Sequence, residues 1–198
     1  VGQALESAFE AEGIRVLRGR QARHITHDGA RFSIDLDGAG IEADRLLVAT
    51  GRTPNTDELD PARAGIETDA RGAIRVDAGL RASANGVYAV GDCTNMPQLV
   101  YVAAAAGTRA AVNMTGGDAE LDLSVLPSVI FTDPQVAAVG LDEEQARTAG
   151  IETVSRRLEL KQVPRALANF DTRGFVRLIA EAGTGRLLGA RVVAHNGG

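Results

Sequence analysis

The sequence contains little cysteine, no long apolar run and no excess of positive charge. Its single cysteine, Cys93, rules out a disulfide within the chain and a site built from several of its thiolates, which fits a reducing compartment. The net charge of -5, without a basic patch interleaved with aromatic residues, argues against a nucleic-acid partner. Apolar stretches such as residues 99–106 are too short to span a membrane, so a cytoplasmic protein without a membrane partner is expected.

Two segments in which an apolar run meets a glycine are the most informative features. Residues 46–50 and 87–90 are short continuous apolar runs, which predict strands buried on both faces. Gly51-Arg52 follows the first run and Gly91-Asp92 follows the second. Because open α/β sheets bind cofactors beyond the carboxyl ends of their strands, these two ends predict two nucleotide sites of a redox flavoprotein.

Asp92 is the best single candidate for a cofactor contact. Its carboxylate can accept a hydrogen bond from a ribitol or ribose hydroxyl, and the alternative is a helix cap or an ordinary turn residue. The alanine-rich segment 99–112 predicts a helix whose amino end would stabilise negative charge on a reduced flavin, with Val100 as the backbone contact. Gly51 and Arg52 would face the second nucleotide, and the alternative is a glycine turn with a surface arginine.

No residue of the chain is predicted to be catalytic or to bind a metal. Cys93 has no basic group or second thiol beside it, so a structural role is favoured. His24 and His27 lack a third ligand, and His195 stands alone near the end.

The remaining patterns predict the secondary structure. A helix through Leu5 and Phe9 ends at Gly13, and residues 14–17 follow as a strand. Residues 31–37 alternate as a half-exposed hairpin strand, and residues 73–76 form a short strand. After Leu126, an antiparallel α+β unit is expected, with one helix from Asp142 to Ala149 and strands over 128–132, 152–160, 175–180 and 187–194.

Ala49-Thr50-Gly51-Arg52-Thr53-Pro54-Asn55, together with Ala89-Val90-Gly91-Asp92, resembles the pyridine nucleotide-disulphide oxidoreductases. The segment 131–140 looks like the start of the dimerisation domain of that family. The resemblance implies parts of two Rossmann-like domains that bind FAD and NAD(P), followed by an α+β dimerisation domain. It places the NAD(P)-binding part at 1–56, the returning FAD-binding part at 57–125 and the dimerisation domain of a homodimer at 126–198.

Residues 97–111 and 163–175 resemble the Hg(II)-reducing branch of the family. The dihydrolipoamide dehydrogenase branch tends to carry a His and a Glu in the helix aligned with 101–107, where this chain has Tyr101 and alanines. The resemblance therefore implies that NADPH passes electrons through FAD and a disulfide, and that Hg(II) is reduced to elemental mercury. A dihydrolipoamide dehydrogenase-like disulfide reductase, or an inactive nucleotide-binding or dimerisation fragment, are the alternatives.

The family's site residues carry over to six positions of this chain. Asp92, Val100 and Gly91 would contact FAD, and Gly51, Arg52 and Val129 would approach the nicotinamide cofactor. The glycine fingerprints for both cofactors and the redox cysteine pairs would lie outside residues 1–198, so both ends are expected to be cuts through a longer protein. The piece alone is expected to be inactive, with one face of Val16 and of Leu47 uncovered.

Overall fold

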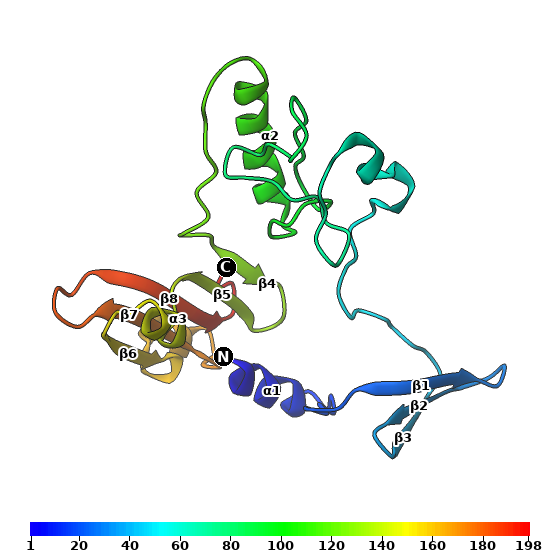
Figure 1. The fold of residues 1–198 in the computed structure, drawn as a ribbon. Coiled ribbons are helices and arrows are strands. Elements are labelled where there is room, and N and C mark those ends of the chain that lie inside the picture. The colour runs from blue at the N-terminus through cyan, green and yellow to red at the C-terminus, as the bar shows by residue number, and fades with distance from the viewer. The chain divides into compact units, whose positions relative to one another are not determined.

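The computed structural model describes residues 1–198, which divide into two compact units. The split unit consists of Val1–Leu46 and Ser124–Gly198, and the central unit is Leu47–Leu123. Figure 1 shows the helices and strands that make up each unit. No helix in the structure combines the length and the apolar character that crossing a membrane requires.

An antiparallel sheet of five strands is the largest element of the split unit (Figure 1). Its order is β4-β5-β8-β7-β6, with bounds Ser128–Ile130 (β4), Gln135–Gly140 (β5), Thr153–Glu159 (β6), Phe175–Glu181 (β7) and Leu187–Ala194 (β8). Four of these strands and their antiparallel pairing confirm the sequence prediction. β5 is not among the predicted strands, because two of its six residues are alanine and two more are glycine and glutamine, which are weak strand signals.

Short helices flank this sheet in the chain. They are α1 (Gly2–Ala11), α3 (Glu143–Thr148), α4 (Pro164–Ala168) and a 3₁₀ turn at Leu160–Gln162. α3 starts with a capping box, in which Asp142 accepts a hydrogen bond from the Gln145 N–H and Gln145 accepts one from the Asp142 N–H. It ends before Gly150, which has a φ of +73°, as the sequence predicts.

A row of apolar side chains across three strands forms the core of the sheet. Val193 of β8 pairs with Val136 of β5 on one side and with Phe175 of β7 on the other. All three are buried, and Ala4 and Leu5 of α1 pack against them. Directly opposed side chains are the contacts that stabilise an antiparallel sheet, so this row also provides the seat for α1.

A second, three-stranded sheet belongs to the amino-terminal part of the split unit. Its strands β1 (Ala22–His27), β2 (Phe32–Leu36) and β3 (Ala39–Ala43) pair antiparallel in sequence order. Burial alternates along β2, which confirms the predicted half-exposed hairpin strand. Asp37 and Gly38, with φ of +53° and +88°, form the two-residue turn between β2 and β3.

Helix α2 (Val100–Met114) is the main element of the central unit. Val102, Ala106, Ala110 and Asn113 form its buried stripe, and the predicted helix is confirmed. The rest of the unit is made of loops, with 3₁₀ turns at Asp57–Leu59 and Pro61–Ala64.

The strands predicted over 73–76 and 87–90 are reduced to isolated bridges in the structure. Ile74 bridges Thr68 and Thr94, and Tyr88 bridges Arg81. Buried side chains hold these loops together, since Leu80 is fully buried and Ala89 and Ile74 are nearly so. Both runs are apolar, but their pairing is too short to form strands.

The predictions of strands over 14–17 and 46–50 are wrong. Neither segment is extended into a sheet, and the Leu47 side chain is 87% exposed. A strand buried on both faces requires a partner strand at its edge and helices above and below it. No strand pairs with either segment within the 198 residues. The uncovered face expected for Leu47 is confirmed, whereas Val16 is half-buried.

Candidate cofactor site at the amino end of helix α2

Gly91 and Asp92 lie in a tight turn that leads toward α2. Gly91 has a φ of +81°, a left-handed conformation that glycine adopts without strain. Its carbonyl oxygen accepts hydrogen bonds from the Thr94 N–H at 3.1 Å and from the Thr94 hydroxyl at 2.7 Å, and Thr94 is buried. This anchored turn presents the Asp92 carboxylate at the surface of the unit.

The amino end of α2 has no side-chain cap. Its N-cap residue is Leu99, which has no side-chain acceptor, so Asp92 is not the cap of this helix. The Val100 side chain, which opens the first turn, is 87% exposed. An uncapped helix end carries partial positive charge and backbone donors that suit an anionic or electron-rich ligand.

Arg52 connects Asp92 to the segment just before α2. Its Nη1 donates to Asp92 Oδ2 at 3.3 Å and to the Gln98 carbonyl oxygen at 3.1 Å. Gln98 in turn donates from Nε2 to the Asp92 carbonyl oxygen at 3.1 Å. The three bonds form a closed ring, named here the Arg52 ring. It uses Oδ2 of the carboxylate, which leaves Oδ1 as an acceptor for a ligand.

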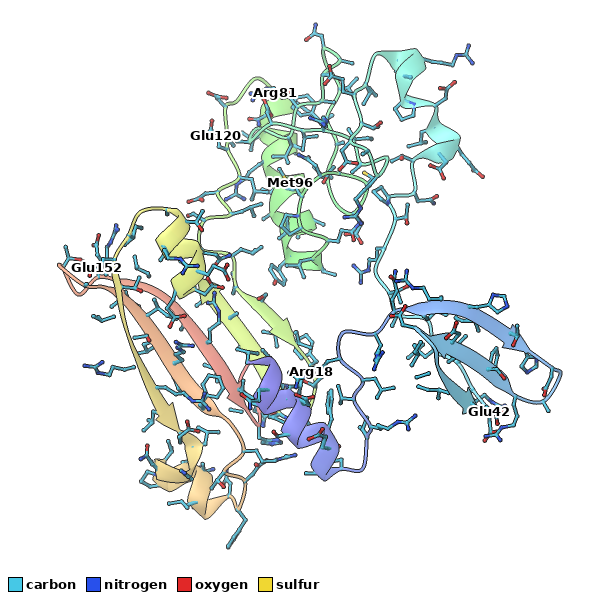
Figure 2. The ribbon with its side chains drawn as sticks, turned by 60° about the horizontal axis from the view of Figure 1, so that its bottom comes forward. Arg18, Glu42, Arg81, Met96, Glu120 and Glu152 are labelled. Carbon is cyan, nitrogen blue, oxygen red and sulfur yellow. The ribbon has the colours of Figure 1, made fainter.

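Arg71 supports the Arg52 ring from a neighbouring turn. Its Nη2 donates to the Arg52 carbonyl oxygen at 2.7 Å. Asp69 fixes that turn by accepting from the Ala73 and Arg71 N–H groups, and these backbone hydrogen bonds lower the pKa of Asp69. A pocket of about 230 Å³ adjoins the turn, and its lining includes Met96 of the stretch before α2, labelled in Figure 2.

Gly51 and Val129 lie in different units of the chain. Gly51, in the central unit, has a φ of +110°, and a Cβ built on it would meet no atom within 4 Å. The backbone is therefore open to close approach at Gly51. Val129 lies on β4 of the split unit, where it pairs with Ala137.

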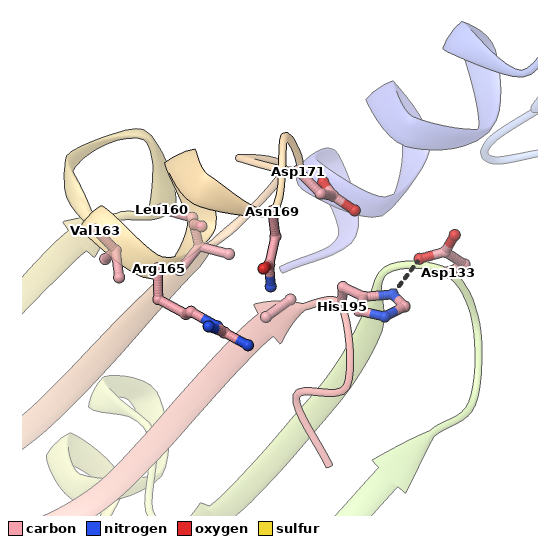
Figure 3. A pocket seen from close by; sticks show the side chains of 9 residues that line it. Asp133, Leu160, Val163, Arg165, Asn169, Asp171 and His195 are labelled. Atoms are coloured by element: carbon pink, nitrogen blue, oxygen red, sulfur yellow. Dashed lines mark ion pairs between the residues drawn. The ribbon is translucent and has the colours of Figure 1, made fainter.

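A second pocket, of about 580 Å³, belongs to the split unit (Figure 3). Asp133, Asp171 and His195 lie on its lining, and one ligand atom from each falls within 4.8 Å of the other two. Arg173 already satisfies both carboxylates, donating from Nη2 to Asp171 at 2.8 Å and to Asp133 at 3.2 Å. His195, isolated in the sequence, has its Nδ1 3.7 Å from Asp133, the pair drawn in Figure 3. The cluster is therefore an ion-pair network centred on a guanidinium.

Two models of one protein family match most of the chain. The model described as pyridine nucleotide-disulphide oxidoreductase matches residues 1–107, more than half of the chain. The model for the dimerisation domain of the same family matches residues 126–198. The chain belongs to the pyridine nucleotide-disulphide oxidoreductase family. The resemblance read from the two glycine-ended segments is confirmed, as is the fold class that it implies.

Curated relatives in this family are similar over the whole chain. Mercuric reductases of Shewanella putrefaciens, Acidithiobacillus ferrooxidans and Shigella flexneri are 55%, 54% and 52% identical to it, respectively. Each alignment covers 100% of this chain and 36% of the relative. The chain thus spans about a third of the length of these relatives.

Two solved structures superpose on nearly the whole chain. LpdA from Mycobacterium tuberculosis superposes with a TM-score of 0.88 at 31% identity, over 98% of this chain and 43% of that chain. The HOCl-induced flavoprotein disulfide reductase RclA from Escherichia coli superposes with a TM-score of 0.87 at 29% identity, over 99% and 46%.

The structure brings five of the six predicted site residues to the amino end of α2, which Val100 opens. Gly91 and Asp92 share a turn, Arg52 bonds to Asp92, and Gly51 precedes Arg52 in the chain. Gln98 and Arg71 are not among the predicted site residues, because their bonds to Arg52 join positions 46 and 19 residues apart.

Proposed function

We propose that this chain is part of an FAD-dependent oxidoreductase that uses NADPH to reduce Hg(II) to elemental mercury. The observation that carries the proposal is the 52–55% identity to mercuric reductases along all of the chain. Tyr101 and the alanines after it, in place of a His and a Glu, support the same branch. The activity belongs to the longer protein, since the chain spans 36% of these relatives.

The residues at the amino end of α2 fit a flavin nucleotide. Asp92 Oδ1 would accept a hydrogen bond from a ribitol hydroxyl, and the uncapped turn at Val100 would offer backbone N–H groups to the ring. The turn requires glycine at position 91, because a φ of +81° is unfavourable for residues that carry a side chain. When bound, FAD would carry two electrons from NADPH toward the metal. The chain's own contribution is to bind the cofactor, orient it and stabilise its charge.

The nicotinamide cofactor is proposed to approach Gly51 and Val129. The Arg52 side chain, which the resemblance also assigns to this cofactor, bonds to Asp92 of the proposed flavin site. Gly51 supports this proposal because nothing in the chain fills the space where its side chain would stand. Val129 is assigned through the resemblance alone.

The organisation that goes with this function has three parts. Residues 1–56 are proposed to belong to the NAD(P)-binding domain, 57–125 to the FAD-binding domain and 126–198 to a dimerisation domain that forms a homodimer. The dimerisation-domain match over 126–198 supports the last part. A single cysteine and the lack of a membrane-crossing helix are compatible with the cytoplasm.

A disulfide reductase of the dihydrolipoamide dehydrogenase type is the second candidate. The similarity to RclA, described as a flavoprotein disulfide reductase, is the observation that favours it. Its identity of 29% is far below that of the mercuric reductases. The two candidates differ in one covalent feature, a cysteine pair at the carboxyl end, which is expected only in the Hg(II)-reducing protein.

The test starts from the source DNA on both sides of this coding segment. Two glycine fingerprints with a cysteine pair upstream, and paired cysteines near the downstream end, are expected. The complete protein should then oxidise NADPH when Hg(II) is added and release mercury vapour. If the complete protein oxidises NADPH with a small disulfide as the electron acceptor but not with Hg(II), the second candidate is established. Stop codons at both edges would contradict both enzymes and leave a nucleotide-binding or dimerisation fragment.

A further inference from the structure

We infer that Arg52 is a positioning residue for the flavin: it fixes the Asp92 carboxylate and the start of α2 relative to each other. The inference rests on the proposed function and deepens it, because it assigns Arg52 to the flavin side of the site. It concerns how the protein fixes the positions of Asp92 and α2 before FAD binds.

The geometry of the Arg52 ring carries the inference. One nitrogen, Nη1, reaches both the Asp92 carboxylate and the Gln98 carbonyl oxygen, at 3.3 Å and 3.1 Å. Gln98 stands two residues before Val100, the first residue of α2. A shift of Arg52 would therefore change the direction of Asp92 and release the segment that leads into the helix.

This contact gives the two oxygens of the Asp92 carboxylate different roles. Arg52 holds Oδ2, so Oδ1 is the oxygen left to face a hydroxyl donor. Without the guanidinium, the carboxylate can rotate about its last side-chain bond and lose that preference. Preorganised hydrogen-bonding groups bind a ligand more tightly because less freedom is lost on binding.

Stability does not account for the Arg52 ring. The side chains of Arg52 and Asp92 are 63% and 56% exposed, and ion pairs with this exposure contribute little to folding. Arg71 also holds Arg52 through the Arg52 backbone carbonyl, a bond that survives any change of the Arg52 side chain. A substitution at Arg52 should therefore leave the unit folded, and its effect can be read at the cofactor.

The experiment compares Arg52→Met and Arg52→Lys with the wild type in the complete protein that contains this chain. Arg63→Met is the matched control, because Arg63 is an exposed arginine of the same unit whose nearest carboxylate partner, Asp60, is 3.8 Å away. The readouts are the FAD dissociation constant, the flavin reduction potential and the KM for NADPH. Circular dichroism of each variant reports whether it is folded.

Arg52→Met should bind FAD about tenfold more weakly, the size expected for one charge-assisted hydrogen bond, and should shift the flavin potential. Arg52→Lys, which keeps the charge, should fall between Arg52→Met and the wild type, and Arg63→Met should match the wild type. The KM for NADPH should change less than twofold in all of them.

A rise in the KM for NADPH with unchanged FAD binding and potential would overturn the inference and place Arg52 at the nicotinamide cofactor. Unchanged FAD binding, potential and KM would also overturn it, since Arg52 would then be an ordinary surface arginine. A wild-type protein that does not bind FAD would instead contradict the proposed function, and the inference with it.

Discussion

Arg173 donates a hydrogen bond from Nη2 to Asp171 Oδ2 at 2.8 Å, and the same nitrogen reaches the Asp133 carboxylate at 3.2 Å. The Arg173 guanidinium holds the pKa of Asp171 at about 2, below its usual 3.8, and the two carboxylates raise the pKa of Arg173. One cation therefore joins the loop before β5 to the loop before β7 at the pocket that contains His195.

Asp171→Asn should lower the stability of the protein in a pH-dependent way. The folded-state pKa of Asp171 lies below the unfolded one, so the pair contributes fully above about pH 4 and loses its contribution as the pH falls toward 2. We expect a loss of roughly 1 kcal/mol near neutral pH, because Arg173 is partly exposed and solvent screens the pair. Thermal unfolding of wild type and variant from pH 2 to pH 7 measures it.

Glu144→Gln is the control for that prediction. Glu144 pairs with Arg147 at 3.9 Å, and both side chains are exposed, so no measurable change is expected. A deficit of Asp171→Asn that stays the same at pH 2 and pH 7 would show that the effect comes from packing rather than charge.

Phe175→Ala should be far more destabilising than Phe170→Ala. Phe175 is 2% exposed, pairs with Val193 and carries the Arg157 guanidinium 3.8 Å from its ring centre. Its truncation should cost about 3–5 kcal/mol. Phe170 is 96% exposed, so its truncation should change the free energy of unfolding by less than about 0.5 kcal/mol. Chemical denaturation of both variants tests this, and similar midpoints would mean that the row of Val136, Val193 and Phe175 is not the core.

The sequence predicts the antiparallel sheet of the split unit well because its signals are local. β7 and β8 are rich in β-branched and other apolar residues, and a glycine-containing turn joins them. β5 is not predicted because its alanines and glycine carry little strand preference, and its place beside β8 comes from pairing with residues 49 to 59 positions away. Propensity cannot report a contact of that kind.

The same limit explains the outcome at residues 46–50. Their apolar composition is typical of a buried parallel strand, but a strand exists only when its neighbours complete the hydrogen bonds. At the candidate site, the motif identified Gly91, Asp92 and Arg52, yet the bond between Arg52 and the Gln98 carbonyl oxygen depends on how two loops fold together. Local residue types point to the site, and the tertiary structure supplies its internal contacts.

Gly174→Ala should disrupt the entry to β7. Gly174 has a φ of +104°, and an added Cβ would overlap the Val193 carbonyl oxygen. Gly185→Ala is the control, because Gly185 has a φ of +71° but open space around it. The control should lose roughly 1–2 kcal/mol from backbone strain alone, and Gly174→Ala should lose clearly more. Equal unfolding midpoints of the two variants would show that the backbone at Gly174 moves away without cost.

Asp92→Ala should weaken FAD binding in the complete protein by roughly tenfold to a hundredfold, as expected for loss of a charged hydrogen-bond acceptor. Asp118→Ala is the control, since Asp118 is an exposed aspartate of the same unit that also pairs with an arginine, Arg81, at 3.0 Å. The losses in the double variant Asp92→Ala/Arg52→Met should be clearly less than additive, because the part of the Arg52 effect that acts through the carboxylate is already gone. Titration of the apoprotein with FAD measures all three. Additive losses in the double variant would mean that Arg52 affects the flavin independently of Asp92, through the Gln98 carbonyl oxygen and the start of α2.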